Sequence, residues 1–398
     1  MASENNTPGP DAPAKASFVY DPKVRSVFYQ AILLAGVAWF GMSIWANLTA
    51  NMARQNIRTG FGFFNNTSSF EIGFSLIPYD RSSTFADVLL VGFLNTMLVA
   101  IIGCILATIL GFTIGIARLS SNWVIARLAT IYVEILRNIP LLLQMFFWYF
   151  GVLKLMPSVK QSFEMPFNMF FNNRGLVAPS PIVSDNFNMV LIALLIALVA
   201  TFFVSRWANK KQDATGVRPP ATLINLGIVV GFVGIVWLAI GASLSWTTPV
   251  LAGFNFKDGI KIPPEFIALL WALVLYTATF IAEIVRAGIL AVPKGQTEAA
   301  QSLGMSEGDL LRQVVIPQAM RVIVPPLTSQ YLNLTKNSSL AVAIGFPELV
   351  SVFMGTTLNQ TGQAVEVVLV TMLIYLAISL ATSAFMNWYN GRIALTER

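Results

Sequence analysis

The feature that most constrains the fold of this chain is a series of long apolar stretches without a charged residue. The hydrocarbon core of a bilayer is about 30 Å thick, and a helix needs roughly 20 apolar residues to cross it. The charge-free stretches lie at 26–50, 88–117, 138–153, 186–205, 219–256, 266–282, 322–335 and 367–391. Because charged residues make up only 11% of the chain, the sequence predicts an all-α integral membrane protein.

Three of these stretches must be adjusted before each fits a single spanning helix. The short stretch at 138–153 extends backward to about Ala129, and the long one at 219–256 holds one helix at about 222–245. The stretch at 322–335 continues to about Ile344 in a helix that we place from about Pro326 onward. With these adjustments the sequence predicts eight transmembrane helices, since glycine and proline are tolerated where neighbouring helices satisfy the backbone.

The loops predict how the chain is oriented. Residues 1–25 are rich in Ala, Pro, Asn and Asp and predict a disordered tail. The run at 26–50 starts late and is long, which favours a permanent span over a cleaved signal peptide. If the tail is cytoplasmic, the cytoplasmic segments hold about twice as many Lys and Arg residues as the outer ones, as the positive-inside rule requires. We therefore expect both termini in the cytoplasm and a periplasmic loop at 51–87.

Composition excludes several kinds of site. The chain has no histidine and one cysteine, Cys104, so it has no His-based zinc site, no Ser-His-Asp triad and no internal disulfide. It has no Gly-x-x-x-x-Gly-Lys-Ser/Thr loop to cradle a nucleotide. The net charge of +6 is dispersed, which indicates membrane topology and no nucleic-acid partner. We expect no metal and no cofactor on this chain.

A polar segment at 295–317 interrupts the apolar pattern on the predicted cytoplasmic side. It has the signals of two short helices. Thr297 is placed to cap the first, and Gly304 stands where a helix end favours a positive φ. Ser306 is followed three residues later by Asp309, an arrangement that resembles a capping box.

The second helix of this hairpin is expected to end at Pro317. Its apolar residues recur at helical spacing and are Leu310, Leu311, Val314 and Val315. An exposed apolar stripe of this kind suits docking into a groove on a cytoplasmic partner. The alternative is an amphipathic surface helix that contacts only lipid headgroups.

The spacing within the hairpin resembles the coupling-helix signature of ABC importer permeases. The signature reads Glu298-Ala299-Ala300, then Gly304, then Val314-Val315-Ile316-Pro317, with Val and Ile where the family usually has Ile and Leu. The resemblance implies that this loop inserts into a nucleotide-binding subunit. The coupling residues it implies are Glu298, Ala299, Ala300, Gly304, Asp309, Leu310, Val314 and Pro317.

Other stretches are similar to the polar amino-acid branch of these permeases. They are "GFLNT" (92–96), "YVEILRNIPLLLQMFFWYFG" (132–151), "AEIVRAGI" (282–289) and "LTKNSSLAVAIGFPEL" (334–349). The resemblance implies a type I importer core, with core helices 1–2 at 88–153 and core helices 3–5 at 266–398.

Three further segments narrow the resemblance. The stretches "RTGFGFF" and "FEIGFSLIPYD" in the first outer loop, and "FFNNRGL" (170–176), resemble the larger permease of broad-specificity L-amino-acid systems. That likeness implies an extra N-terminal helix at 26–50 and an insertion at 154–265 with two further spans.

The same resemblance implies an assembly. Its members are a second permease forming a heterodimer, a cytoplasmic pair of ATP-binding subunits that hold ATP and Mg, and a periplasmic amino-acid-binding protein. The cargo would be L-amino acids, the location would be the bacterial inner membrane, and this chain would not itself be an enzyme.

Polar residues inside spans are candidates for the substrate path, because charge is costly in lipid. Ten residues from Pro326, Lys336 would lie about 15 Å deep, near the bilayer midplane. There it could meet a substrate carboxylate, or it could form a structural ion pair with Glu283. Its polar neighbours are Asn333, Asn337 and Ser338.

Further candidates lie toward the cytoplasmic boundary. The pairs Glu134–Arg137 and Glu283–Arg286 have i, i+3 spacing, which places both charges on one helix face. They could form an inner gate, or the arginines could extend to the membrane interface. Gln144 could bond the backbone of an amino-acid substrate, or a neighbouring helix.

Two other classes of function compete with an importer subunit. A self-sufficient secondary transporter or channel predicts inverted repeats and buried acidic residues, and the sequence has no convincing repeat. A membrane-embedded enzyme predicts a cluster of acid, base or metal ligands within a span, and the sequence has none. A requirement for ATP and for a co-expressed ATPase would distinguish the importer from both.

Overall fold

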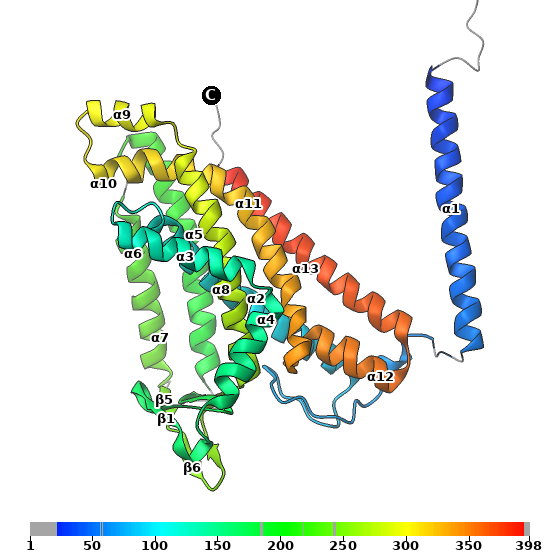
Figure 1. Ribbon diagram of the computed structural model, residues 1–398. Helices are drawn as coiled ribbons and strands as arrows, with labels where there is room; N and C mark the ends of the chain where they lie inside the picture. Colours follow the sequence, from blue (N-terminus) through cyan, green and yellow to red (C-terminus); the bar gives the residue numbers. More distant parts are fainter. Residues whose placement is uncertain are drawn as a thin grey trace, which may run out of the picture.

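The computed structural model describes residues 22–55, 57, 59–183, 186–217, 219–241 and 244–393 (Figure 1). Most of the predicted N-terminal tail, residues 1–21, lies outside the described residues. The helices are α1 Pro22–Arg54, α2 Phe85–Ala117, α3 Trp123–Asn138, α4 Leu141–Phe146, α5 Phe187–Thr215, α6 Ala221–Gly227, α7 Val233–Ala239, α8 Pro264–Leu290, α9 Lys294–Ser302, α10 Glu307–Leu310, α11 Ile316–Asn337, α12 Leu358–Thr361 and α13 Ala364–Ile393. The strands are β1 Phe163–Met165, β2 Met169–Asn172, β3 Gly175–Ala178, β4 Ser180–Val183, β5 Leu244–Thr247, β6 Val250–Ala252, β7 Asn255–Lys257 and β8 Ile260–Ile262.

The prediction of a helical membrane protein is confirmed. Among the described residues, 6 helices are long and apolar enough to cross a bilayer: α1, α2, α5, α6–α7 taken together, α8 and α13. The number of spans rises to 7 if the bent pair of α3 and the segment that starts with α4 is counted as one span. Since α11 is not in this set, the count of eight stays a prediction.

Two predicted helix boundaries are wrong. The helix expected at 222–245 ends at Ala239, and the chain leaves it through Gly241, whose φ of +60° departs from helical geometry. The helix expected from Pro326 begins ten residues earlier, at Ile316, and Pro325 and Pro326 lie inside it.

The single helix predicted between 129 and 153 is also wrong. Two helices replace it, α3 and a segment that starts with α4, bent by 103°. The break follows from Pro140, whose ring disfavours a helical conformation in the residue before it. Ile139 is accordingly extended, with φ −92° and ψ +126°. The buried Gln144 amide donates to the carbonyl oxygens of Leu136 at 2.8 Å and Ile139 at 3.0 Å, which stabilises the bend.

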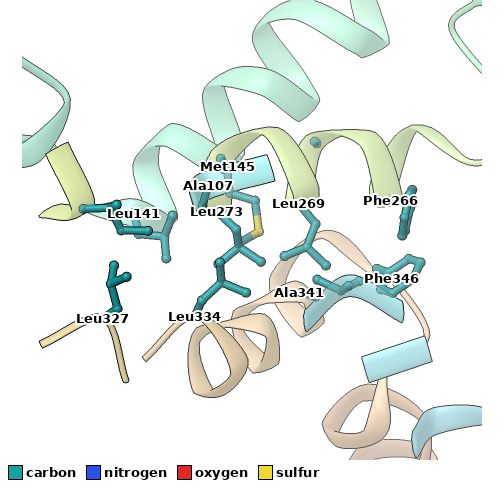
Figure 2. Close-up of a cluster of buried hydrophobic side chains, with 14 of the residues drawn as sticks. Ala107, Leu141, Met145, Phe266, Leu269, Leu273, Leu327, Leu334, Ala341 and Phe346 are labelled. Carbon is teal, nitrogen blue, oxygen red and sulfur yellow. The ribbon is translucent and has the colours of Figure 1, made fainter. Parts of the chain in front are cut away.

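Close backbone packing joins α2 to α8 at the centre of the bundle. A methyl group added to Gly111 would lie 2.6 Å from Cβ of Ile281, and one added to Gly115 would lie 2.8 Å from the carbonyl oxygen of Ala282. Glycine at these positions lets the helix backbones approach, as in other membrane bundles. Figure 2 shows the apolar core beside this contact, where Leu269 and Leu273 of α8 meet side chains from α4 and α11.

The predicted outer loop at 51–87 packs on the bundle. A 3₁₀ turn at Gly62–Asn65 carries Phe63 into a buried cluster with Phe85, Val88, Leu349, Val352, Phe353 and Val367. The buried Asn95 of α2 donates to the carbonyl oxygens of Phe74 at 2.9 Å and Pro347 at 2.8 Å. The loop therefore joins the N-terminal ends of α2 and α13.

The insertion at 154–265 contains strands that the sequence analysis did not predict. A four-stranded antiparallel sheet has the order β1-β2-β3-β8, and two-stranded pairs form from β4 with β5 and from β6 with β7. Leu176 of β3 faces Ile262 of β8 in the register. This pairing brings the beginning and the end of the insertion together just before α8. The spans α5 and α6–α7 therefore leave and rejoin the core at one place.

Candidate functional site

The hairpin formed by α9 and α10 lies at the same end of the molecule as the start of α1 and the end of α13 (Figure 1). Its first helix begins at Lys294, after Pro293. The prediction that Thr297 caps this helix is wrong, because the Thr297 hydroxyl donates to the carbonyl oxygen of Lys294 at 2.6 Å. Proline before the first turn sets the entry with its fixed φ, here −60°.

A Schellman motif ends α9, and Gly304 is its left-handed residue, with a φ of +75°. The Met305 amide donates to the Ala300 carbonyl at 3.2 Å, and the Gly304 amide donates to the Gln301 carbonyl at 2.9 Å. Met305 also packs against Ala300, the apolar contact that accompanies this motif. The sequence prediction of a positive φ at Gly304 is confirmed.

The predicted cap of the second helix is confirmed as well. The Ser306 hydroxyl oxygen accepts from the Asp309 amide at 3.2 Å, and the hydroxyl donates to the Asp309 carboxylate at 2.7 Å. Asp309 also lies in the first turn of α10, where a negative charge is favourable.

The predicted end of this helix at Pro317 is wrong. From α10 the chain passes through a π-helical turn, Leu311–Val315, directly into α11. Pro317 is the second residue of α11, a position where a missing N–H is tolerated. The hairpin is therefore continuous with a long helix of the bundle.

The expected exposed stripe is wrong for Leu310 and Val315, whereas Leu311 is exposed as expected. Leu310 and Val315 are buried and pack with Ala300, so they hold the two helices of the hairpin together. The exposed apolar side chains are Leu303, 82% exposed, and Leu311, 49% exposed. Helical spacing alone does not reveal this inward packing.

The hairpin is fixed to two helices of the bundle. Ile289 of α8 and Val292 after it pack against the hairpin core. A methyl group added to Gly288 of α8 would lie 2.3 Å from Ile323 of α11, which shows how closely these helices pack. The hairpin is therefore attached to both α8 and α11.

An ion-pair cluster ties α2 to α8 near the same end. Glu283 accepts from the guanidinium of Arg118 at the end of α2, and from Arg286 at 2.8 Å and 3.2 Å. The predicted pair between Glu283 and Lys336 is wrong, because two arginines occupy this carboxylate. Arg118 was not among the site residues predicted from the sequence. As the first charged residue after the uncharged run of α2, it could have been singled out.

The other predicted charge pair does not form. Glu134 and Arg137 are both exposed on α3, and no ion pair joins them among the described residues. The Arg137 guanidinium lies over the ring of Phe280, 5.2 Å from its centroid. This cation–π contact links α3 to α8.

The candidates around Lys336 lie near the C-terminal end of α11. Lys336 is about 30 Å along the helix from Ile316, so the predicted depth of about 15 Å from a start at Pro326 no longer applies. Lys336 and Asn333 are exposed, Asn337 is half-buried, and the buried Ser338 donates to the carbonyl of Thr335 at 2.7 Å. Within the described residues Lys336 forms no ion pair.

Residues 107–395 match the family model of the binding-protein-dependent transport system inner membrane component. The chain belongs to this family. The match covers the hairpin, the ion-pair cluster and the polar end of α11, so these features belong to a transport permease. The resemblance inferred from the hairpin sequence is thereby confirmed.

Relatives match along nearly their whole length. One is the general L-amino acid transport system permease protein AapQ of Rhizobium johnstonii, 52% identical over 96% of this chain and 95% of the relative. The putative amino-acid ABC transporter permease protein YhdX of Escherichia coli strain K12 is 48% identical over 95% of this chain and 96% of the relative. The glutamate/glutamine/aspartate/asparagine transport system permease protein BztB of Rhodobacter capsulatus is 41% identical over 97% and 99%.

A solved structure described as an amino acid ABC transporter with histidines has a chain that is 21% identical and covers 77% of this chain and 95% of its own length. Its TM-score is 0.46.

Proposed function

We propose that this chain is the membrane subunit of an ATP-driven, binding-protein-dependent importer of L-amino acids. The observation that carries the proposal is the hairpin, in which the Glu298-Ala299-Ala300 and Gly304 signature lies on a capped unit attached to α8 and α11. The names of the full-length relatives support amino acids as cargo.

In this proposal a separate pair of cytoplasmic subunits binds ATP and Mg and carries out the hydrolysis. Glu298, Ala299 and Leu303 are exposed on the hairpin and available to such a subunit. Because the hairpin continues into α11 and packs on α8, its displacement moves both helices. The contact between Arg118 and Glu283 then extends the movement to α2.

A polar face on α11 supports a second permease subunit in the assembly. Ser329, Asn333 and Lys336 are exposed and lie at i, i+4 and i+7, on one side of the helix. A lysine in contact with lipid tails is unfavourable, so this face requires water or protein beside it. A water-filled path between this chain and a second, different permease meets that requirement.

The same face provides contacts for an amino-acid substrate. The Lys336 ammonium can attract the substrate carboxylate, with Asn333, Asn337 and Ser338 nearby to orient it. Gln144 has a smaller role, because its NH₂ group is occupied by the bend between α3 and α4. Its carbonyl oxygen is buried and has no partner among the described residues.

An inner gate is proposed for the charged residues of α3 and α8. Arg286 is held by Glu283, whereas Glu134 and Arg137 are exposed and form no ion pair among the described residues, so they could meet charges on a second permease. Closing contacts of this kind would form and break as α8 moves with the hairpin.

The proposed topology has both termini in the cytoplasm of a bacterium and the chain in its inner membrane. The hairpin, the start of α1 and the end of α13 lie at one end of the molecule, and β1, β5 and β6 lie at the opposite end (Figure 1). The periplasmic amino-acid-binding protein would approach the end with the strands. The core segments at 88–153 and 266–398 would form the transport path, with 26–50 and 154–265 as additions.

The proposal is tested by Glu298→Lys, with Glu307→Lys as the matched control. Both carboxylates are exposed on the hairpin, and only Glu298 belongs to the signature. In vesicles holding the purified four-component transporter, we expect Glu298→Lys to abolish amino-acid uptake and its ATP hydrolysis, and Glu307→Lys to retain most of both. Uptake by vesicles that hold this chain alone would refute the proposal and support a secondary transporter.

A further inference from the structure

Among the described residues, helix α1 has no packing partner along its apolar length. No residue of its most apolar 18-residue window is buried, and in Figure 1 the helix stands apart from the bundle. One side of α1 is a seam of mostly small residues at helical spacing, which are Ala31, Ala35, Ala38, Ala46 and Thr49, with the larger Met42 between Ala38 and Ala46. Small residues on one face let helices approach closely in membranes, where packing drives association.

The bundle has an apolar groove between α2 and α13. Two adjoining hollows of about 820 Å³ and 530 Å³ form it, and both are lined by Met97 of α2 and by Ile378 and Ala381 of α13. From Ala86 to Ile109 the groove follows α2 for about 35 Å, close to the thickness of a bilayer core. Its length and its apolar lining match one transmembrane helix.

The groove lies away from the polar face of α11. Tyr331 and Thr335 of α11 form part of its lining, whereas Asn333 and Lys336 project from the other side of the same helix. A second permease that covers the polar face therefore leaves this groove open.

A short connection brings α1 to this groove. The Gly60 amide donates to the Glu366 carboxylate, and the Gly60 carbonyl oxygen accepts from Gln363 at 2.9 Å. Gly60 is thus held at the first turn of α13. The chain between Arg54 and Gly60 can extend at most about 20 Å, and packed helix axes are about 8–10 Å apart. The outer end of α1 is therefore confined to the neighbourhood of the groove.

We propose that α1 packs lengthwise in the groove between α2 and α13, with its small-residue seam against them. In this arrangement α1 runs antiparallel to both helices, and its large side chains on the opposite face, such as Leu33 and Val37, contact lipid. The extra N-terminal helix then completes the lipid-facing wall of its own subunit. This inference does not depend on the cargo or on the coupling role of the hairpin.

The chain's single cysteine provides the test. Cys104 lines the groove. The number of residues between Cys104 and the outer end of α2 equals the number between Ala35 and the outer end of α1. In antiparallel packing the two residues are level. Ala35→Cys faces the groove, and the matched variant Val37→Cys lies two residues away, on the opposite face.

Both variants are made in the complete transporter in its native membrane and oxidised with copper phenanthroline. Disulfide-linked peptides are identified by mass spectrometry, with Cys104→Ala as the background. We expect the peptide containing Ala35→Cys to be linked to Cys104 within one chain at least about ten times more than the one containing Val37→Cys. A link requires Cα atoms within about 7 Å, so this ratio reports which face of α1 packs in the groove.

Three outcomes would overturn the proposal: no link from either position, equal links from both, or a link between two chains of doubled mass. If Ala35→Cys lowers the amount of protein in the membrane, Ala38→Cys samples the same seam one turn nearer the outer end. Amino-acid uptake by the reduced variants shows that the transporter is intact, so loss of the link is separate from loss of transport.

Discussion

The left-handed residue of the hairpin permits a sharp test of the local structure. Gly304 has a φ of +75°, and no heavy atom lies within 4 Å of a methyl group added there. Gly304→Ala therefore introduces no collision, and its cost is the backbone penalty for an L-residue with positive φ, about 1 kcal/mol. Gly308 provides the matched control, because it is helical, within α10, and also has open space around an added methyl group. There the same substitution favours the helix by about 1 kcal/mol.

These opposite signs predict opposite changes in local opening. A change of 1 kcal/mol alters an equilibrium about fivefold, so the two variants should differ about 30-fold in the opening of the hairpin. The Met305 amide, which donates to the Ala300 carbonyl across the turn, reports this opening directly. Hydrogen–deuterium exchange of peptides from 294–310, in the transporter in nanodiscs, should be about fivefold faster in Gly304→Ala and slower in Gly308→Ala.

Function gives a second measurement. If the hairpin transmits force only when it is folded, amino-acid-stimulated ATP hydrolysis should fall in Gly304→Ala and persist in Gly308→Ala. Gly304→Asn should exchange more slowly than Gly304→Ala, because asparagine tolerates the left-handed conformation. Equal exchange in Gly304→Ala and Gly308→Ala would refute the assignment of Gly304 as the residue that closes the hairpin.

Three further experiments test the packing of the helices and the proposed substrate path. In a double-mutant cycle of thermal unfolding, Arg118→Gln and Glu283→Gln should couple by about 1 kcal/mol, and additive effects would show that the ion pair is not stabilising. Gly111→Ala should destabilise the bundle by about 1–3 kcal/mol, because the new methyl group would lie 2.6 Å from a side-chain carbon of α8. Gly103→Ala, at 3.1 Å from the end of a leucine side chain, should cost less in the same unfolding assay. Lys336→Glu should abolish uptake of amino acids into vesicles and Lys336→Arg should retain part of it, whereas normal uptake by Lys336→Glu would exclude the proposed contact with the substrate carboxylate.

Several features could be predicted because they depend on neighbouring residues. The apolar lengths of α1, α2, α5 and α13 follow from runs of uncharged residues, which the bilayer selects by thickness alone. The positive φ of Gly304 and the cap at Ser306 depend on contacts within a few residues. The coupling signature is also local, so the family could be recognised before the fold was known, and the family match confirms it.

Other predictions were wrong where distant segments decide the result. Pro317 was expected to end a helix, but a preceding π-helical turn and packing against α8 carry the chain onward. Leu310 has the spacing of an exposed stripe, and only its contact with Ala300 on the other helix shows that it faces inward. The strands of the insertion are three or four residues long, too short for a clear alternation of polar and apolar residues.

The sequence by itself determined that the chain crosses a membrane, that it carries a hairpin with the spacing of the importer-permease signature, and which family it belongs to. Only the tertiary structure decided that Arg118 forms an ion pair with Glu283 and that Gln144 supports the bend at Pro140. It also decided that Lys336 is exposed and does not pair with Glu283. The physical reason is the distance along the sequence over which each property is set. Hydropathy, caps and turn conformations are set by residues close in sequence, whereas ion pairs and burial depend on which helices pack together.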